Sequence, residues 1–245
     1  MVDAGRFHAH SVTFTYRHGR WWASIQGVAA PFHHQQRSPA ARSQTPVGVD
    51  LGVKTLAVVA DTQGNIVEEV EGPKSLTAAQ DRLRTLNRSL ARTTPGSRQH
   101  RTVSRQLNRL HRRVAAIRKH ETHQFTTRLV RNQQTITVED LHVAGMSRLK
   151  TLGRAVADAG MGNLLATLGY KADWHGVDLH IADRWYPSSK TCSQCGHVKD
   201  TLLLSERVYR CEACGLVLDR DANAAVNLSR WPAMSGELPP TRAAA

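Results

Sequence analysis

Four cysteines, arranged as two CxxC pairs, constrain the fold of this chain more than any other feature. Cys192 and Cys195 form the first pair, Cys211 and Cys214 form the second, and fifteen residues separate the two pairs. This spacing is typical of two short turns that place four thiolates tetrahedrally around one zinc ion. Four thiolates leave no open coordination position. We therefore expect a structural zinc that stabilises a small ribbon without a core of its own.

The charge of the chain indicates a polyanionic partner. Its 245 residues include 33 Lys and Arg against 20 Asp and Glu, for a formal net charge of +13. Nucleic acid is the simplest partner of this kind, because each phosphate that a protein neutralises releases condensed counterion. Charge alone leaves open a basic solvated surface or a structural role of the ribosomal kind.

The cysteine count and the apolar segments indicate where the protein works. The paired turns use all four cysteines, which leaves none for a disulfide framework or a catalytic thiol, and a reducing compartment is expected. The first ten residues lack the apolar core of a signal peptide, and no apolar run approaches the ~20 residues of a membrane helix. We expect a soluble, cytoplasmic protein without a membrane partner.

Two segments precede the main apolar pattern. Residues 11–26 alternate apolar and polar side chains on either side of a turn at residues 18–19, which predicts a β-hairpin. Residues 28–45 lack periodicity and are rich in Pro, Gln, Arg and Ser, which indicates a linker.

Several apolar runs then predict a sheet. The segment from residue 47 to 72 reads as three antiparallel strands, the first ending at Asp50. The run TITVED predicts a strand ending at Glu139, and residues 177–183 predict another. Residues 155–175 are compatible with a helix despite three glycines, and a last helix begins near Asp221.

Residues 74–131 predict a basic helical hairpin. Apolar residues recur at steps of three and four on both sides of a break at Pro95 and Gly96, as in two amphipathic helices folded on each other. The outward face is rich in arginine, and such a face can lie along a nucleic-acid backbone; an ordinary solvated face is the alternative. The candidate contacts are Arg105, Arg109, Arg112 and Arg113.

Three carboxylates stand where strands end or a helix begins. Asp50, Glu139 and Asp221 are far apart in the sequence, as expected of a site assembled at the carboxyl edge of a sheet. Three acids at close quarters repel each other, and Mg²⁺ relieves that repulsion with the oxygen ligands it prefers. Two such ions about 4 Å apart would hold the attacking water and the leaving 3′ oxygen of a phosphodiester. We assign Asp50 as the bridging ligand.

Other polar residues near these motifs have competing interpretations. Asp219 and Asp140 are the runners-up to Asp221 and Glu139, and Asp219 also stands where a helix N-cap is needed. Just before the first cysteine pair, three residues are candidate phosphate contacts, although a turn is their ordinary role. They are Ser188, Ser189 and Lys190.

Four ordered segments resemble the TnpB (OrfB) family of transposon-encoded, RNA-guided DNA endonucleases, which are relatives of type V CRISPR effectors. The segments are GVDLGVKTLAVVAD, TVEDLHVAGM, RWYPSSKTCSQCGHVK and YRCEACGLVLDRDANAAVN. The resemblance implies a RuvC-like nuclease domain of RNase H fold with Asp50, Glu139 and Asp221 as its acids. It also implies a zinc ribbon that binds the target nucleic acid, and a guide RNA from the transposon end that pairs with DNA.

The residue patterns and the resemblance together give a domain plan. Residues 1–27 would be the end of the family's wedge β-barrel, so that the chain is an N-terminally truncated member, and residues 28–45 a linker. The RuvC-like domain would occupy residues 46–187 and the final helix 218–230, with the ribbon at 188–217 between them and a disordered tail at 231–245. The expected fold is α/β, a mixed RNase H-like sheet with an inserted basic helical hairpin and an inserted four-cysteine ribbon.

Two hypotheses of function follow, and a third is weaker. The first is a Mg²⁺-dependent, RNA-guided endonuclease that cuts DNA. The second is a nucleic-acid-binding protein that does not cleave, such as a guide-dependent repressor or an inert remnant. The presence of all three acids favours the first. A ribosomal or transcription factor with a zinc ribbon has no need of the acids at the strand ends.

Overall fold

The computed structural model describes residues 7–17, 19–29, 42–72, 74–150, 153–203 and 205–236. The chain divides into two compact units, one formed by residues 1–35 and 74–121, the other by residues 36–73 and 122–245. The described helices include none that is both long enough and apolar enough to cross a membrane.

The first unit contains a β-hairpin and most of a helical hairpin. Strands β1 (Phe7–Arg17) and β2 (Arg20–Ala29) pair antiparallel, which confirms the predicted hairpin but extends it at both ends. Val28 and Ala29 were assigned to the linker and instead continue β2, while residues 30–41 lie outside the described residues.

Helices α1 (Ser75–Ala91) and α2 (Arg98–Asn132) form the predicted helical hairpin. Their apolar residues pack together around Ala79, Leu83 and Val114, as the steps of three and four predict. Twelve Arg and Lys side chains between residues 82 and 119 are exposed or half-buried, against the two acids Asp81 and Glu121. This balance leaves the hairpin strongly positive.

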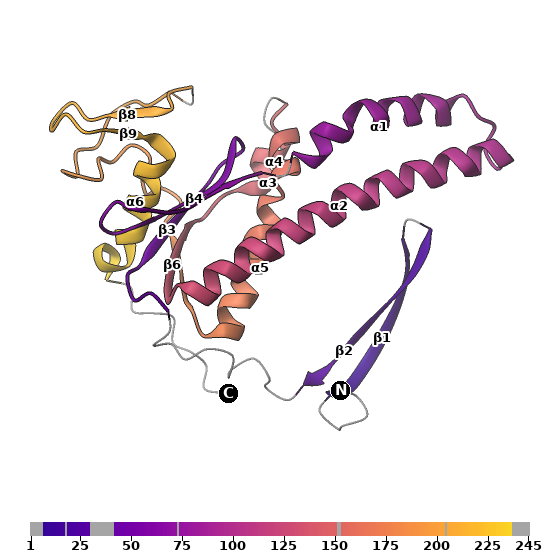
Figure 1. Ribbon diagram of the computed structural model, residues 1–245, viewed down its shortest axis with the longest axis horizontal. Helices are drawn as coiled ribbons and strands as arrows, with labels where there is room; N and C mark the ends of the chain where they lie inside the picture. Colours follow the sequence, from indigo (N-terminus) through magenta and orange to yellow (C-terminus); the bar gives the residue numbers. More distant parts are fainter. Residues whose placement is uncertain are drawn as a thin grey trace. The chain divides into compact units, whose positions relative to one another are not determined.

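The second unit is built on a five-stranded mixed sheet of order β5-β4-β3-β6-β7 within the described residues (Figure 1). Strands β3 and β4 and strands β4 and β5 pair antiparallel, while β3 with β6 and β6 with β7 pair parallel. The strands are β3 (Val47–Leu51), β4 (Thr55–Asp61), β5 (Ile66–Glu71), β6 (Thr135–Glu139) and β7 (Asp178–Ala182). All five were predicted.

The main core lies on one face of this sheet. Val47 and Val49 of β3 pack there with Phe125 of α2 and with Leu164 and Leu168 of α5 (Met161–His175), all of them buried. Lys171 of α5 ties the two helices together, because its Nζ donates to the carbonyl oxygen of His123 and to two threonine hydroxyls of α2.

Helix α6 (Arg220–Ser235) packs on the opposite face of the sheet, against β3 and β4 (Figure 1). Its Ala222, Ala225 and Val226 contact Val58 and Ala60 of β4. A methyl group at Gly48 of β3 would overlap the carbonyl oxygen of Ala225. Glycine at this position therefore lets α6 approach the sheet closely.

Three expectations differ from the structure. The helical segment at 155–175 is two helices, α4 (Gly153–Ala159) and α5, separated by Gly160 in the left-handed conformation. Helix α3 (Val143–Arg148) was not predicted and has no buried residue. The tail from residue 231 was expected to be disordered, but α6 continues to Ser235; residues 237–245 lie outside the described residues.

The four cysteines lie in a ribbon with two short strands, β8 (Val208–Arg210) and β9 (Val217–Asp219), paired antiparallel. Its small core is Tyr209, Cys192 and Cys211, with Leu202 and Leu216 packed against them. Arg230 of α6 donates to the carbonyl oxygens of Thr62 and Ser193 and so fastens the helix to both the sheet and the ribbon.

Candidate carboxylate pocket and four-cysteine site

Asp50 owes its position to the alternation of β3. Val47, Val49 and Leu51 face the main core, so Gly48 and Asp50 point to the face that α6 covers. Asp50 therefore lies beside the helix rather than in the apolar core.

Glu139 is placed next to Asp50 by the register of two parallel strands. Val47 pairs with Ile136 and Val49 with Val138, so that β6 ends beside Asp50 with Glu139 as its last residue. Neighbouring parallel strands bring their carboxyl ends to the same edge of a sheet, where open α/β folds place their sites. The structure thus brings the two acids to the same edge of the sheet.

Asp221 reaches the same edge from the first turn of α6. Asp219 is the N-cap of this helix, because its Oδ1 accepts from the backbone N–H groups of Asp221 and Ala222 at 2.9 and 3.1 Å. Asp219 thus has the capping role that the sequence indicated, and it fixes the turn from which Asp221 projects.

One pocket brings the three carboxylates together. Asp50, Glu139 and Asp221 line it with Gly52 and Ser189 and with four larger side chains. These are Val53, Met146, Met161 and Arg207. Asp140, the runner-up to Glu139, is instead in an ion pair with Arg184 at 2.7 Å and lines a different pocket.

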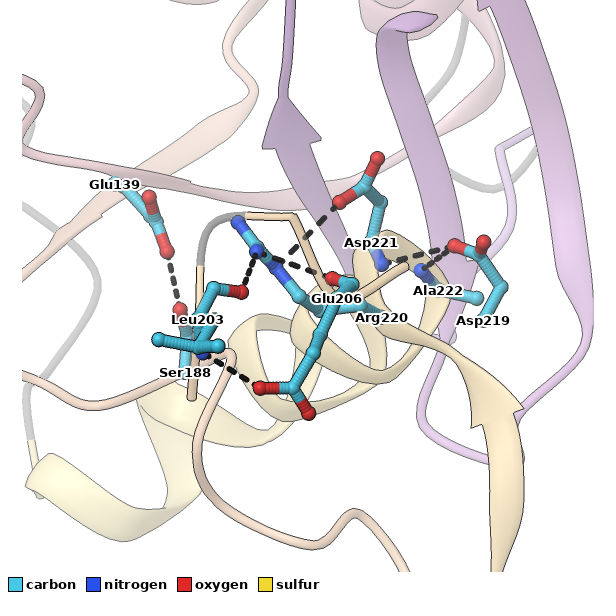
Figure 2. Close-up of polar contacts among 8 residues, drawn as sticks. All are labelled: Glu139, Ser188, Leu203, Glu206, Asp219, Arg220, Asp221 and Ala222. Atoms are coloured by element: carbon cyan, nitrogen blue, oxygen red, sulfur yellow. Dashed lines mark hydrogen bonds and ion pairs between the residues drawn. The ribbon is translucent and has the colours of Figure 1, made fainter. Parts of the chain in front are cut away.

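Arg220 introduces a positive charge into this acidic pocket. Its Nε lies 4.0 Å from Asp221 Oδ1, and its Nη1 donates to the carbonyl oxygens of Leu203 and Glu206, both at 3.3 Å (Figure 2). These two carbonyls belong to the ribbon segment between the cysteine pairs. The ribbon therefore helps to hold the guanidinium beside the carboxylates.

The electrostatics of the pocket favour a cation. Burial raises the pKa of Asp50 well above its usual value, and repulsion by Glu139 and Asp221 raises it further, while Arg220 opposes the shift. Burial also raises the pKa of Glu139, against the hydrogen bond from Ser188 and the charge of Arg220. Without a cation nearby, these carboxyls resist ionisation. A divalent cation such as Mg²⁺ would offset their repulsion and prefers the hard oxygen ligands that they supply.

The four cysteine sulfurs form a compact cluster. All four Sγ atoms lie within 4.8 Å of one another, which fits a four-thiolate metal site. In each turn the N–H of a glycine with positive φ, Gly196 or Gly215, donates to the carbonyl oxygen of the first cysteine at 2.9 or 3.1 Å. Hydrogen bonds, first that from the backbone N–H of Cys214, lower the pKa of the Cys211 thiol to about 6. Against the N–H of Leu216, burial and the neighbouring thiols raise the pKa of Cys214 to about 12, so the four thiols ionise together only with a cation among them.

The three residues before the first cysteine pair have different surroundings. Ser188 is only 3% exposed, and its Oγ donates to Glu139 Oε1 (Figure 2). Ser189 lines the carboxylate pocket, and Lys190 Nζ donates to the carbonyl oxygen of Asp200 at 2.8 Å. The structure thus places Ser188 against a candidate metal ligand, not on an open surface.

The four arginines chosen from the sequence lie on α2. Arg105, Arg109 and Arg113 are exposed and Arg112 is half-buried. Arg109 and Arg113 also line a groove between the two helices with Arg82 of α1. Their contact with nucleic acid remains a prediction.

The mixed sheet, the acids at its carboxyl edge and the inserted four-cysteine ribbon define a RuvC-like domain with a ribbon insertion. Residues 29–150 match the OrfB_IS605 family, described as "Probable transposase", and residues 162–228 match the Cas12f1-like TNB domain. The chain belongs to the OrfB (TnpB) family of transposon-associated proteins.

Individual relatives agree with this assignment. A Mycobacterium tuberculosis protein named as a candidate RNA-guided DNA endonuclease is 39% identical over 94% of this chain and 50% of its own length. Escherichia coli InsQ, named in the same way, is 31% identical over 89% of this chain and 55% of its own length. The chain spans about half the length of these curated relatives.

A solved structure shares the fold. The Cas12f1 chain in a cryo-EM complex with sgRNA and target DNA superposes with a TM-score of 0.54 and 17% identity, covering 89% of this chain and 55% of that chain. At this identity the likeness concerns the fold alone.

Proposed function

We propose that this protein is a divalent-metal-dependent nuclease of the RuvC-like kind, acting on DNA and directed by an RNA. The observation that carries the proposal is the meeting of Asp50, Glu139 and Asp221, from two parallel strands and a helix start, in one pocket. The raised pKa values of Asp50 and Glu139 support a cation there, because the bare acids repel one another.

In this proposal Asp50, Glu139 and Asp221 would hold Mg²⁺ in the pocket. Bound there, Mg²⁺ would activate a water and stabilise the leaving oxygen of a phosphodiester. The protein's own groups orient the substrate. Arg207 and Arg220 line the pocket and offer positive charge to the phosphate oxygens.

The proposal assigns the four thiolates of the ribbon to a structural zinc. Their compact arrangement leaves no ligand position for a reacting water, so the chemistry belongs to the carboxylate pocket.

The basic helical hairpin supports a nucleic-acid partner. Residues 81–121 hold twelve Arg and Lys against two acids, and exposed arginines bind phosphate backbones without reading sequence. In this proposal an RNA from the transposon end supplies the sequence specificity by pairing with the target.

One experiment tests the proposal. The protein is co-expressed with its flanking element, any bound RNA is sequenced, and cleavage of matched DNA is measured with and without Mg²⁺. We expect cleavage by the wild type and by Asp81→Asn, an exposed acid outside the pocket, and loss of cleavage in Asp50→Ala. Cleavage that persists in Asp50→Ala refutes the site, whereas bound RNA without any cleavage favours a repressor.

A further inference from the structure

The loop that follows β7 presses a serine against the carboxylate pocket. Within this loop Tyr186 turns inward, where its ring contacts that of Trp231 in α6. Two residues later Ser188 is 3% exposed and donates its hydroxyl proton to Glu139 Oε1 (Figure 2). A buried neutral donor thus contacts one oxygen of a candidate metal ligand.

Two asparagines of α6 hold the backbone of this loop. Asn227 Nδ2 donates to the carbonyl oxygens of Ser188 and Thr191, both at 2.7 Å. Asn223, one turn earlier on the same face of the helix, donates to Thr191 at 2.7 Å and accepts from the N–H of Ser193 at 2.9 Å. Both asparagines are at most 4% exposed, so these contacts are buried.

We propose that Ser188 is a positioning residue that orients the Glu139 carboxylate for metal binding, and that Asn227 acts through Ser188. The inference rests on the proposed function, because it takes Glu139 to be a ligand. A glutamate has three rotatable side-chain bonds, so a fixed donor to one of its oxygens selects the rotamer that presents the other. Hydrogen-bond partners of metal ligands commonly change metal affinity by about 10–100-fold when removed.

This arrangement also gives a role to the two asparagines in the segment DANAAVN. Their side chains dock the entry of the ribbon onto α6, the helix that carries Asp221. These hydrogen bonds fix the loop to the helix. Ser188 approaches the pocket from the loop, and Asp221 approaches it from the helix. If Ser188 had only a structural role, its hydrogen bond to Glu139 would stabilise the fold. Removing the hydroxyl would then lower stability but leave metal affinity unchanged.

Metal affinity therefore separates the two roles. The test uses the full chain with its zinc retained, and Mn²⁺ as the probe because carboxylate sites accept it in place of Mg²⁺. Free Mn²⁺ is followed by its electron paramagnetic resonance signal for the wild type, Ser188→Ala and Ser229→Ala. Ser229 is the matched control, a buried serine of α6 whose hydroxyl donates to the carbonyl oxygen of Val226. Zinc content and melting temperature are measured for each variant.

We expect Ser188→Ala to bind Mn²⁺ about 10–100-fold more weakly than the wild type, and Ser229→Ala to bind as the wild type does. Equal affinity in Ser188→Ala, with zinc retained, overturns the inference while leaving the proposed function intact. If the wild type and Asp50→Ala give the same signal of free Mn²⁺, the pocket of the wild type does not bind Mn²⁺. That result overturns the proposed function itself.

A double-mutant cycle tests the part of Asn227. If Asn227 acts through Ser188, Asn227→Ala weakens Mn²⁺ binding in the wild-type background but adds little once Ser188 is alanine. Additive effects of the two substitutions show that Asn227 acts by another route and overturn that step.

Discussion

The close approach of α6 to β3 predicts a strong effect of the smallest possible substitution, Gly48→Ala. The added methyl group would overlap the backbone carbonyl of Ala225 and the backbone nitrogen of Ser229, and would lie 2.6 Å from Leu228 Cβ. Two of these three neighbours are backbone atoms, which a side-chain rotation cannot move. The helix must therefore shift away from the sheet.

Overpacking of this kind costs about 1–3 kcal/mol. Since each kcal/mol shifts Tm by about 2–4 °C in a domain of this size, we expect a fall of roughly 2–12 °C. The same shift moves Asp221 relative to Asp50, which lies two residues from Gly48 on the same face of β3. Divalent-metal affinity should therefore fall along with stability.

The assay is thermal unfolding followed by Mn²⁺ titration, with Gly169→Ala as the matched control. Gly169 lies inside α5, and a methyl group there meets no atom within 4 Å. That substitution should stabilise the protein by about 0.5–1 kcal/mol, the usual cost of glycine in a helix. A Gly48→Ala protein as stable as the wild type, with unchanged metal affinity, would refute the packing described for α6.

Three further predictions concern the ribbon, the pocket and the basic hairpin. Cys211→Ser should lower the bound zinc well below one ion per chain and unfold the ribbon around Tyr209, as measured by elemental analysis and NMR. Asp50→Asn should raise Tm in Mg²⁺-free buffer at neutral pH. The pKa of Asp50 is higher in the folded than in the unfolded chain, so the stability of the wild type falls as pH rises above the ordinary carboxyl range, and the variant loses the part of this slope that Asp50 contributes. The affinity for DNA falls with salt, and a plot of log K against log salt concentration gives a negative slope. Neutralising four arginines should make this slope less negative by about 3–4. The four are Arg105, Arg109, Arg112 and Arg113.

Each of these expectations has a contradicting result. Full zinc content in the Cys211→Ser protein would contradict a four-thiolate site. An Asp50→Asn protein whose Tm follows pH as the wild type does would show that Asp50 does not carry the buried charge. A salt dependence that the arginine substitutions leave unchanged would move the nucleic-acid contact away from α2.

The sheet and the acids could be predicted because their signals are local. Short apolar runs that end on an acid mark β3 and β6, and parallel pairing of such strands brings Asp50 and Glu139 to one edge. The two CxxC turns likewise carry their own geometry, since each cysteine pair is closed by a following glycine with positive φ.

What the sequence did not reveal depends on tertiary contacts. The hydroxyl of Ser188 contacts Glu139, 49 residues away, so the sequence around Ser188 indicates only local roles, a turn or a candidate phosphate contact. The tail from residue 231 was expected to be disordered, but α6 continues to Ser235 with Pro232 inside it, and the ring of Trp231 contacts that of Tyr186. Packing against a distant partner overrode the local signal in both places.

The most direct test of the carboxylate site is anomalous X-ray scattering from a crystal soaked in Mn²⁺ with zinc retained. We expect anomalous density in the pocket, at coordination distance from carboxylate oxygens of Asp50, Glu139 and Asp221, and its loss in Asp50→Ala. Manganese bound elsewhere, with this pocket free of it in the wild-type crystal, would contradict the assignment of the three acids to one metal site.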